Sequence, residues 1–377
     1  MVEALTAPAD QEAAEPKPRA AARPSAVDAQ QATEAPASQP SGKPVATKPA
    51  HRPVRRRRRP LVVMVVLSVL AVVIAFGLLA WDNPMPPGTD GFWRIAQLRT
   101  SNLTVLALVA FCQALATVAF QTATNNRILT PSIMGFESLY TAIQTSAVYF
   151  LGISGVVILQ GVPQFLLMIV LMVGLSLLLY GWLLSGKRAN LQVMLLIGIV
   201  IGGGLGSISM FMRRLLTPSE FDVLAARLFG NIANADARYL PIAIPLALVA
   251  GALLWMRARR LNVMALGRDA STNLGLNHRR ELIAVLTLVS VLMAVSTSMV
   301  GILTFFGFLA ATLAYQLADT YDHRVVFPIA ALTGFVVLGG AYFIVKHLFY
   351  AQGVVSIIIE LVGGSVFLFM ILRKGRL

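Results

Sequence analysis

The chain has 377 residues, of which 57% are hydrophobic and 13% are charged, and its formal net charge is +14. Soluble domains carry about 25% charged residues, so this composition indicates a membrane protein. The basic residues sit in short loops beside apolar runs, a pattern typical of cytoplasmic loops, which argues against a nucleic-acid-binding protein. The single cysteine, Cys112, cannot form an internal disulfide.

The first 59 residues differ in composition from the rest. Residues 1–54 are rich in Ala, Pro, Gln and Ser and have almost no large apolar side chains, so they cannot bury enough surface to fold. The arginine run Arg55–Arg59 follows directly before the first apolar run. We therefore predict a disordered, Ala/Pro-rich cytoplasmic tail over residues 1–59 and a transmembrane domain over 60–377.

Apolar runs predict an all-α fold, a polytopic bundle of about ten membrane-spanning helices. The longest runs exceed the roughly 20 residues that cross a bilayer as helix, and they lack the alternation of barrel strands. The run over 304–318 is short and indicates a broken or partly buried helix. The predicted spans are residues 61–81, 103–122, 133–151, 156–184, 191–212, 240–256, 281–300, 304–318, 326–345 and 354–372.

Basic loops predict the orientation of the bundle. If the arginine run is inside, five further basic segments fall inside too: Arg127, Lys187–Arg188, Arg257–Arg280, Arg324 and Arg373–Arg376. Both termini are then cytoplasmic. On the opposite side, Thr217 followed by Pro218 predicts the start of a short amphipathic helix that lies on the outer face.

The longest polar loop on the predicted cytoplasmic side covers about residues 257–280. Its two Leu-Gly pairs, Leu266-Gly267 and Leu274-Gly275, are spaced like the ends of a short helix. The chain has no G-x-x-x-x-G-K-[ST] sequence and so no P-loop of its own. A short helix at the cytoplasmic face is what such a membrane subunit needs in order to be driven by a separate ATPase.

No catalytic or metal site can be assembled from the sequence, and we expect the chain not to be an enzyme. We expect His278, His323 and His347 to be solvated loop residues. Glu137 and Glu360 lie within predicted spans, where a carboxylate is a functional hypothesis by default. We expect Glu137 to snorkel or to cap its helix. Glu360 is expected to line a pathway or subunit interface, or to make a local hydrogen bond.

Several blocks of the sequence, in order, resemble the FecCD-type permease family of ABC importers, which carry iron-siderophore complexes and cobalamin. The resemblance covers roughly residues 60–377. Its blocks are Gln121 with Thr124–Pro131 and Ile133–Gly135, then Leu266–Gly275, Gly301–Phe308, Asp322–Arg324 with Pro328 and Gly334, and Gly353–Leu372.

The chain departs from the family pattern at three places. Ala311-Thr312 stands where the family usually has Pro-His, and Tyr315 stands where it has Arg. Asn125-Asn126-Arg127 replaces the common Arg-Asn-Pro. These variants resemble the branch that uses two different permease subunits for siderophore uptake.

The resemblance implies a type II ABC importer permease in a bacterial cell (inner or plasma) membrane, with a ferric siderophore as cargo. Its implied partners are a dimer of ATP-binding subunits, a second permease subunit and an extracytoplasmic siderophore-binding protein. Nucleic acid is not among them. No cofactor is expected on this chain, because ATP would be bound by the ATPase. The main alternative is a secondary transporter that uses an intramembrane carboxylate such as Glu360.

The resemblance also implies roles for individual residues. Arg99 and Lys346 match outward-facing basic residues that dock the binding protein, although both could instead be interfacial anchors that snorkel. Gln121 and Glu360 are candidates for the translocation pathway. The expected contacts with the ATPase are Leu266, Gly267, Ala270, Leu274 and Gly275.

Overall fold

The computed structural model describes residues 58–81, 84–86, 88–158, 160–185, 191–229, 232, 235–347 and 355–374. They belong to the second of two units into which the chain divides, Pro53–Leu377. Residues 1–57 of the predicted tail and the basic loop Lys187–Arg188 lie outside the described residues. The last two residues of that tail, Arg58 and Arg59, belong to the first helix. In the described residues the regular secondary structure is helical apart from one isolated bridge between Phe229 and Ile302, which confirms the all-α prediction.

Each predicted span has a corresponding helix. In the described residues, eight helices are long and apolar enough to cross a membrane, and α11 and α13 provide two shorter apolar helices. The elements are α1 (Arg58–Ala80), α2 (Asp90–Ala123), η2 (Ser132–Phe136), α3 (Glu137–Ile158), α4 (Val162–Ser185), α5 (Leu191–Arg214), α6 (Pro218–Leu228), η4 (Ala237–Tyr239), α7 (Leu240–Met256), α8 (Ala258–Met264), α9 (Arg268–Asn273), α10 (His278–Val300), α11 (Phe306–Ala318), α12 (His323–His347) and α13 (Val355–Lys374).

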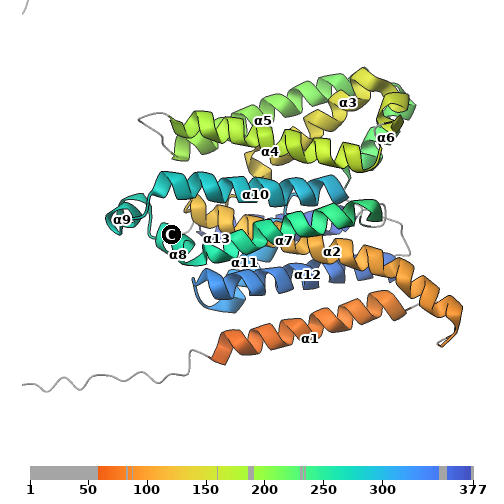
Figure 1. Ribbon diagram of the computed structural model, residues 1–377, viewed down its shortest axis with the longest axis horizontal. Helices are drawn as coiled ribbons and strands as arrows, with labels where there is room; N and C mark the ends of the chain where they lie inside the picture. Colours follow the sequence, from red (N-terminus) through yellow and green to blue (C-terminus); the bar gives the residue numbers. More distant parts are fainter. Residues whose placement is uncertain are drawn as a thin grey trace, which may run out of the picture. The chain divides into compact units, whose positions relative to one another are not determined.

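The central helix is α2, which packs against α10, α11 and α12 (Figure 1). From Val109 to Ala123 almost every α2 residue is buried, and many of these residues are alanines. Small side chains allow close helix approach: a Cβ on Gly334 of α12 would lie 3.2 Å from the carbonyl oxygen of Ala110. Close packing therefore holds α2 in the middle of the bundle.

The start of α2 corrects the sequence prediction. We expected a span over 103–122, but the helix begins at Asp90, after the cap residue Thr89 whose hydroxyl accepts from the Phe92 amide at 3.3 Å. Charged residues such as Arg94 interrupt the apolar pattern without interrupting the helix. Arg99 therefore lies within α2 and not in a segment that precedes it.

Close glycine contacts also join η2 to α5. Gly135 has a φ of 100°, and a Cβ there would lie 3.3 Å from the Cα of Gly202 and from the carbonyl oxygen of Gly198. Tight packing of the membrane glycines of α5 is seen at Gly198 and Gly202. It is not seen within this chain at Gly203, Gly204 and Gly206, where a Cβ would meet nothing within 4 Å.

The predicted broken span over 304–318 is confirmed. Helix α11 has 13 residues and rises by about 20 Å, less than the roughly 30 Å of the bilayer core. It is preceded by the irregular segment Gly301–Phe305, in which the Ile302 amide donates to the Leu228 carbonyl at 3.2 Å. Irregular backbone is tolerated at membrane depth where protein covers it, and most of α11 is buried.

Helix α10 runs the length of the bundle and can be used to name its two ends. Its 23 residues span about 34 Å, from the start beside α9 to the end beside α6, so we call these the α9 end and the α6 end (Figure 1). Arg59 pairs with Asp319 at 3.1 Å, which places the start of α1 next to the α11–α12 loop. At the α6 end, a capping box between Thr217 and Glu220 starts α6 with Pro218 in its first turn, which confirms the predicted helix start.

We predict that Gly307→Ala lowers the stability of the bundle. A Cβ at Gly307 would lie 2.2 Å from Oγ1 of buried Thr117, so α2 and α11 would have to move apart. Overpacking of this kind costs about 1–3 kcal/mol, which thermal unfolding in detergent would measure. Gly340→Ala is the matched control, because a Cβ there meets nothing within 4 Å. Equal melting temperatures for the two variants would contradict the prediction.

Candidate functional site at the α9 end

Two short helices, α8 and α9, form the predicted coupling loop. The expected helix between the Leu-Gly pairs is confirmed as Arg268–Asn273, with Gly267 (φ 93°) and Gly275 (φ 83°) at its ends. Both φ values favour glycine, which explains these residues physically. Leu266 and Leu274 are 61% and 64% exposed, so the loop presents two large apolar side chains. Ala270 lies on α9 between them; a role for these residues in contacting an ATPase stays a prediction.

Helix α8 was missed in the sequence, where residues 257–280 were expected to hold one short helix. The arginines of α8 concealed a helical pattern. Ala258, Leu261 and Met264 follow one another at intervals of three residues, and all three are buried. That spacing is one face of a helix. Helix α8 therefore buries one face against the bundle, whereas α9 has a single buried residue, Ser271.

Hydrogen bonds hold α9 against the start of α10. The buried Ser271 hydroxyl lies 2.8 Å from Nδ1 of His278 and donates to the Arg268 carbonyl at 2.9 Å. The Leu276 amide donates to the Ser271 carbonyl at 3.0 Å. The exposed leucines are thus displayed on a fixed turn.

A carboxylate clamp attaches the start of α8 to α10. One oxygen of buried Glu281 accepts from Nη1 of Arg257 at 2.6 Å, and the other accepts from Nη1 of Arg260. Charge-assisted bonds to one carboxylate are stronger than neutral bonds, and truncating Glu281 would leave two arginines unpaired. The clamp gives α7, α8 and α10 a common anchor.

A second polar cluster joins α8 to α12 and α2. Asn262 on α8 contacts His323 and Asp322, and Nε2 of His323 lies 2.6 Å from Oγ1 of Thr122. The hydrogen bond from Asn262 holds the pKa of Asp322 below its ordinary value. Thr122 Oγ1 also lies 3.3 Å from the Tyr315 hydroxyl, so four helices meet through this cluster.

The expectation for the histidines was wrong at two positions. His323 is 1% exposed and His347 is 8% exposed, and they are the first and last residues of α12. The helix extends beyond the apolar run 326–345, so both rings are packed rather than solvated. His278 is partly buried at the start of α10.

Two departures from the family pattern are in contact. The guanidinium of Arg127 stacks over the ring of Tyr315 at 4.6 Å and over that of Tyr321 at 4.5 Å. The pattern that the chain resembles has Arg at the position of Tyr315 and Pro at that of Arg127. In this chain the positive charge therefore lies on the other residue of the contacting pair. Nε2 of Gln121, which is 2% exposed, donates to the Arg127 carbonyl at 2.7 Å. Its role in a pathway stays a prediction.

These groups surround a polar cavity of about 900 Å³. The cavity extends from the loop after α2 to the turn between α8 and α9, where Leu266 lines it. Amides, a guanidinium and a carboxylate line it, so it can accept a hydrogen-bonding partner. Among the described residues, no three or more His, Cys, Asp or Glu side chains are grouped so that they could hold a metal ion. Its other lining residues include Asn125, Asn126, Asn262, Thr320 and Asp322.

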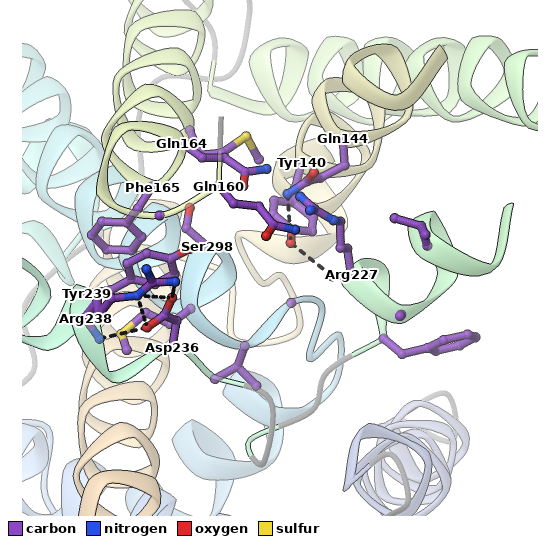
Figure 2. A pocket seen from close by; sticks show the side chains of 18 residues that line it. Tyr140, Gln144, Gln160, Gln164, Phe165, Arg227, Asp236, Arg238, Tyr239 and Ser298 are labelled. Carbon is purple, nitrogen blue, oxygen red and sulfur yellow. Dashed lines mark hydrogen bonds and ion pairs between the residues drawn. The ribbon is translucent and has the colours of Figure 1, made fainter. Parts of the chain in front are cut away.

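A second cavity, of about 400 Å³, lies at the α6 end (Figure 2). The Tyr140 hydroxyl donates to the Arg227 carbonyl at 3.1 Å and accepts from Nε2 of Gln144 at 3.3 Å. The Arg238 guanidinium donates hydrogen bonds to both carboxylate oxygens of Asp236, and these bonds lower the pKa of that carboxyl. Figure 2 places Gln144, Gln160 and Gln164 around this cavity, so the α6 end offers a polar pocket.

The two predicted docking residues lie at the C-terminal ends of helices, Arg99 beside the end of α1 and Lys346 at the end of α12. Nη1 of Arg99 donates to the carbonyls of Leu79 at 3.3 Å and Trp81 at 2.6 Å, so it caps the C-terminus of α1. Lys346 lies in the last turn of α12. The capping contact gives Arg99 a structural role, and docking by either residue stays a prediction.

The intramembrane carboxylates lie near each other. One oxygen of Glu137 accepts from the Thr304 hydroxyl at 2.8 Å, and the other oxygen is buried without a partner among the described residues. Glu137 is thus bonded to Thr304 at the first residue of α3, and its expected role, snorkelling or capping that helix, stays a prediction. Glu360 on α13 is close enough to interact with it electrostatically. The role of Glu360 stays a prediction.

Comparisons with known proteins agree with this architecture. The model of the FecCD transport family matches residues 60–373. The petrobactin import system permease protein FatC of Bacillus anthracis is 49% identical over 87% of this chain and 93% of its own length. The petrobactin import system permease protein YclO of Bacillus subtilis is 32% identical over 84% of this chain and 97% of its own length.

One solved structure matches the fold. It is a metal-chelate type ABC transporter in an inward-facing conformation, with a TM-score of 0.70 and 20% identity, covering 83% of this chain and 99% of that one. The match confirms the predicted importer-permease fold. The relatives are permease proteins, in agreement with the expectation of a transport subunit rather than an enzyme.

We predict that Arg127→Ala has opposite effects on stability in two backgrounds, the native chain and a Tyr315→Arg variant. In the native chain it removes the cation–π stack and lowers stability by about 1 kcal/mol. In a Tyr315→Arg variant, two guanidinium groups face each other, and the same Arg127→Ala substitution raises stability because it removes the repulsion. Thermal unfolding of the four proteins measures both effects. A loss of stability in both backgrounds would show that the two departures do not compensate.

Proposed function

This chain belongs to the FecCD transport family, and from that premise we propose that it is the permease subunit of an ATP-driven importer for a ferric siderophore. The observation that carries the proposal is the fixed α9 turn with its two exposed leucines, Leu266 and Leu274. A chain without a P-loop needs such a surface to receive work from a separate ATPase.

The proposed cargo is a siderophore of the petrobactin class, because FatC and YclO are named for petrobactin import. A chelated iron needs no ligands from the permease. Recognition of the chelate would therefore rest with a binding protein outside the cell, and the permease would supply a passage. The permease relatives disfavour the alternative of a secondary transporter.

The proposed assembly places this chain in the bacterial cell membrane with the α9 end in the cytoplasm. The arginines of α8, α9 and the start of α10 gather at that end, as the positive-inside rule requires. A second permease chain would complete the passage, and an ATPase dimer would bind below. Each ATPase would receive one α9 in a cleft and move it as ATP closes the dimer.

The direct test is reconstitution in proteoliposomes with the ATPase, the binding protein and each candidate permease partner. ATP hydrolysis and uptake of ferric petrobactin are measured together. Uptake that requires a second, different permease would establish a heterodimer, and uptake with this chain alone a homodimer. If no ATPase associates with the chain, the proposed function is wrong.

We predict that Leu274→Glu combined with Gly275→Lys uncouples transport. Leu274 is exposed, so charge there leaves membrane insertion intact while it disrupts an apolar contact with the ATPase. We expect ATPase association to weaken by at least about tenfold, or about 1.4 kcal/mol, and uptake to fall with it. Leu215→Glu, at an exposed leucine of the α6 end, is the control and should keep ATPase association. Normal uptake in the double variant would show that α9 is not the coupling helix.

We predict that Arg99→Glu combined with Lys346→Glu weakens binding of the substrate-binding protein. Exposed charge pairs steer and orient partners, and they act most strongly in dilute buffer, where the Debye length is about 30 Å at 0.01 M salt. The loss should shrink in 0.5 M salt. Since Arg99 also caps α1, the melting temperature must be measured alongside, and Arg99→Gln with Lys346→Gln separates loss from reversal of charge. An unchanged affinity in dilute buffer would remove the docking assignment.

A further inference from the structure

Asn262 is bound to α12 by both ends of its amide. Oδ1 accepts from the backbone N–H of His323 at 3.0 Å and also from Nδ1 of the same residue. Nδ2 donates to Oδ1 of Asp322 at 2.9 Å. A carboxylate can only accept, so this arrangement fixes the orientation of the amide and places the proton of His323 on Nδ1. One side chain of α8 therefore makes three directed bonds to the start of α12.

The chain of bonds continues from α12 into the core. Nε2 of buried His323 lies 2.6 Å from Oγ1 of Thr122, which is one turn from the end of α2. The same hydroxyl oxygen lies 3.3 Å from the hydroxyl of Tyr315 on α11. Polar contacts thus link four helices one after another, from α8 through α12 and α2 to α11. Two of the side chains in this chain of contacts, His323 and Thr122, are buried.

At its other end, α8 is rigidly continued into α9. The amides of Ala265, Leu266 and Gly267 donate to carbonyls within α8, at 2.9 Å, 3.1 Å and 3.0 Å. Helix α9 starts at the next residue. A turn closed by three backbone hydrogen bonds passes a displacement on to α8 and absorbs little of it.

The remaining contacts of α8 differ in kind. Its buried side chains, Ala258, Leu261 and Met264, pack through apolar contacts, which are not directional and permit sliding. The Glu281 clamp holds α8 to α10 and not to α12. A directed link between α8 and α12 is provided by Asn262, since hydrogen bonds weaken steeply with misalignment.

We propose that Asn262 is the positioning residue through which movement of α9 is delivered to α12 and α2. The proposal rests on the proposed function of this chain as an ATP-driven permease. Asn262 does not touch cargo or ATP. It keeps α12 in register with α8, so that displacement of the coupling turn displaces the core helices and is not lost as sliding between them.

The test compares Asn262→Ala with the native chain in the complete reconstituted transporter. The measured quantity is the amount of ferric siderophore taken up per ATP hydrolysed. We expect hydrolysis to stay within about twofold of native while uptake per ATP falls by about tenfold, equivalent to about 1.4 kcal/mol of lost coupling. Thr287→Ala is the matched control: the Thr287 hydroxyl on α10 donates within its own helix, to the Ile283 carbonyl at 2.8 Å, so the ratio in this variant should equal that of the native chain.

A purely structural role for Asn262 would give a different result. Fewer folded complexes would lower hydrolysis and uptake in proportion, the ratio would stay native, and the proposal would be overturned. If Asn262→Ala does not assemble, Asn262→Asp decides, because it keeps the two acceptor bonds to His323 but repels Asp322: a reduced ratio supports the proposal, and a native ratio overturns it. A native transporter without ATP-dependent uptake would instead refute the proposed function itself.

The His323 variants add a directional check. His323→Asn keeps a side-chain donor toward Asn262 and loses the contact with Thr122. His323→Gln favours Thr122 and loses the side-chain bond to Asn262, although the backbone N–H of residue 323 still donates to Asn262. If the link to α8 is what matters, uptake per ATP falls more in His323→Gln than in His323→Asn. A double-mutant cycle of His323→Gln with Asn262→Ala should then be non-additive, and additive losses would count against the proposal.

Discussion

The burial of α2 is the constraint on which the rest of the structure depends. Its second half is buried on all sides by α10, α11 and α12, so every polar group at its end needs a partner within the protein. Gln121 bonds to the Arg127 carbonyl, and Thr122 meets His323 and Tyr315. The burial that packs α2 thus also creates the polar cluster that ties it to its neighbours.

That cluster shows how a family pattern can change without loss of its physical content. A positive charge beside the end of α2 is supplied here by Arg127, in place of the family's Arg at the position of Tyr315. The Tyr315 ring is the aromatic partner of this contact, and the Arg127 guanidinium stacks over its face. The cation–π stack holds the exposed guanidinium of Arg127 against the electron-rich face of the Tyr315 ring.

The sequence could predict what repeats along the chain. Apolar runs revealed each membrane helix, including the short helix α11, and the two Leu-Gly pairs located α9. It could not predict α8, whose three buried residues were concealed among arginines, or the first turns of α2, where charge interrupts the apolar run. The histidine error has the same origin, because His323 lies beyond the apolar run and is buried by partners on α2 and α8. The contacts of Asn262, Thr122 and Tyr315 join residues 60 to 201 positions apart, and no local pattern carries them.

The two ends of the bundle differ in a way that suits a machine driven from one side. At the α9 end, ion pairs and amide bonds fasten α8 and α9 to α10 and α12, so a force applied there meets a connected body. At the α6 end, a polar cavity lies among α3, α4, α6 and α10, with buried oxygens of Gln144 and Ser298 that have no partner among the described residues. Under the proposed function, the connected α9 end would pass a small displacement of α9 to the helices around this cavity, so that movement applied on one side of the bundle would change the shape of the pocket on the other.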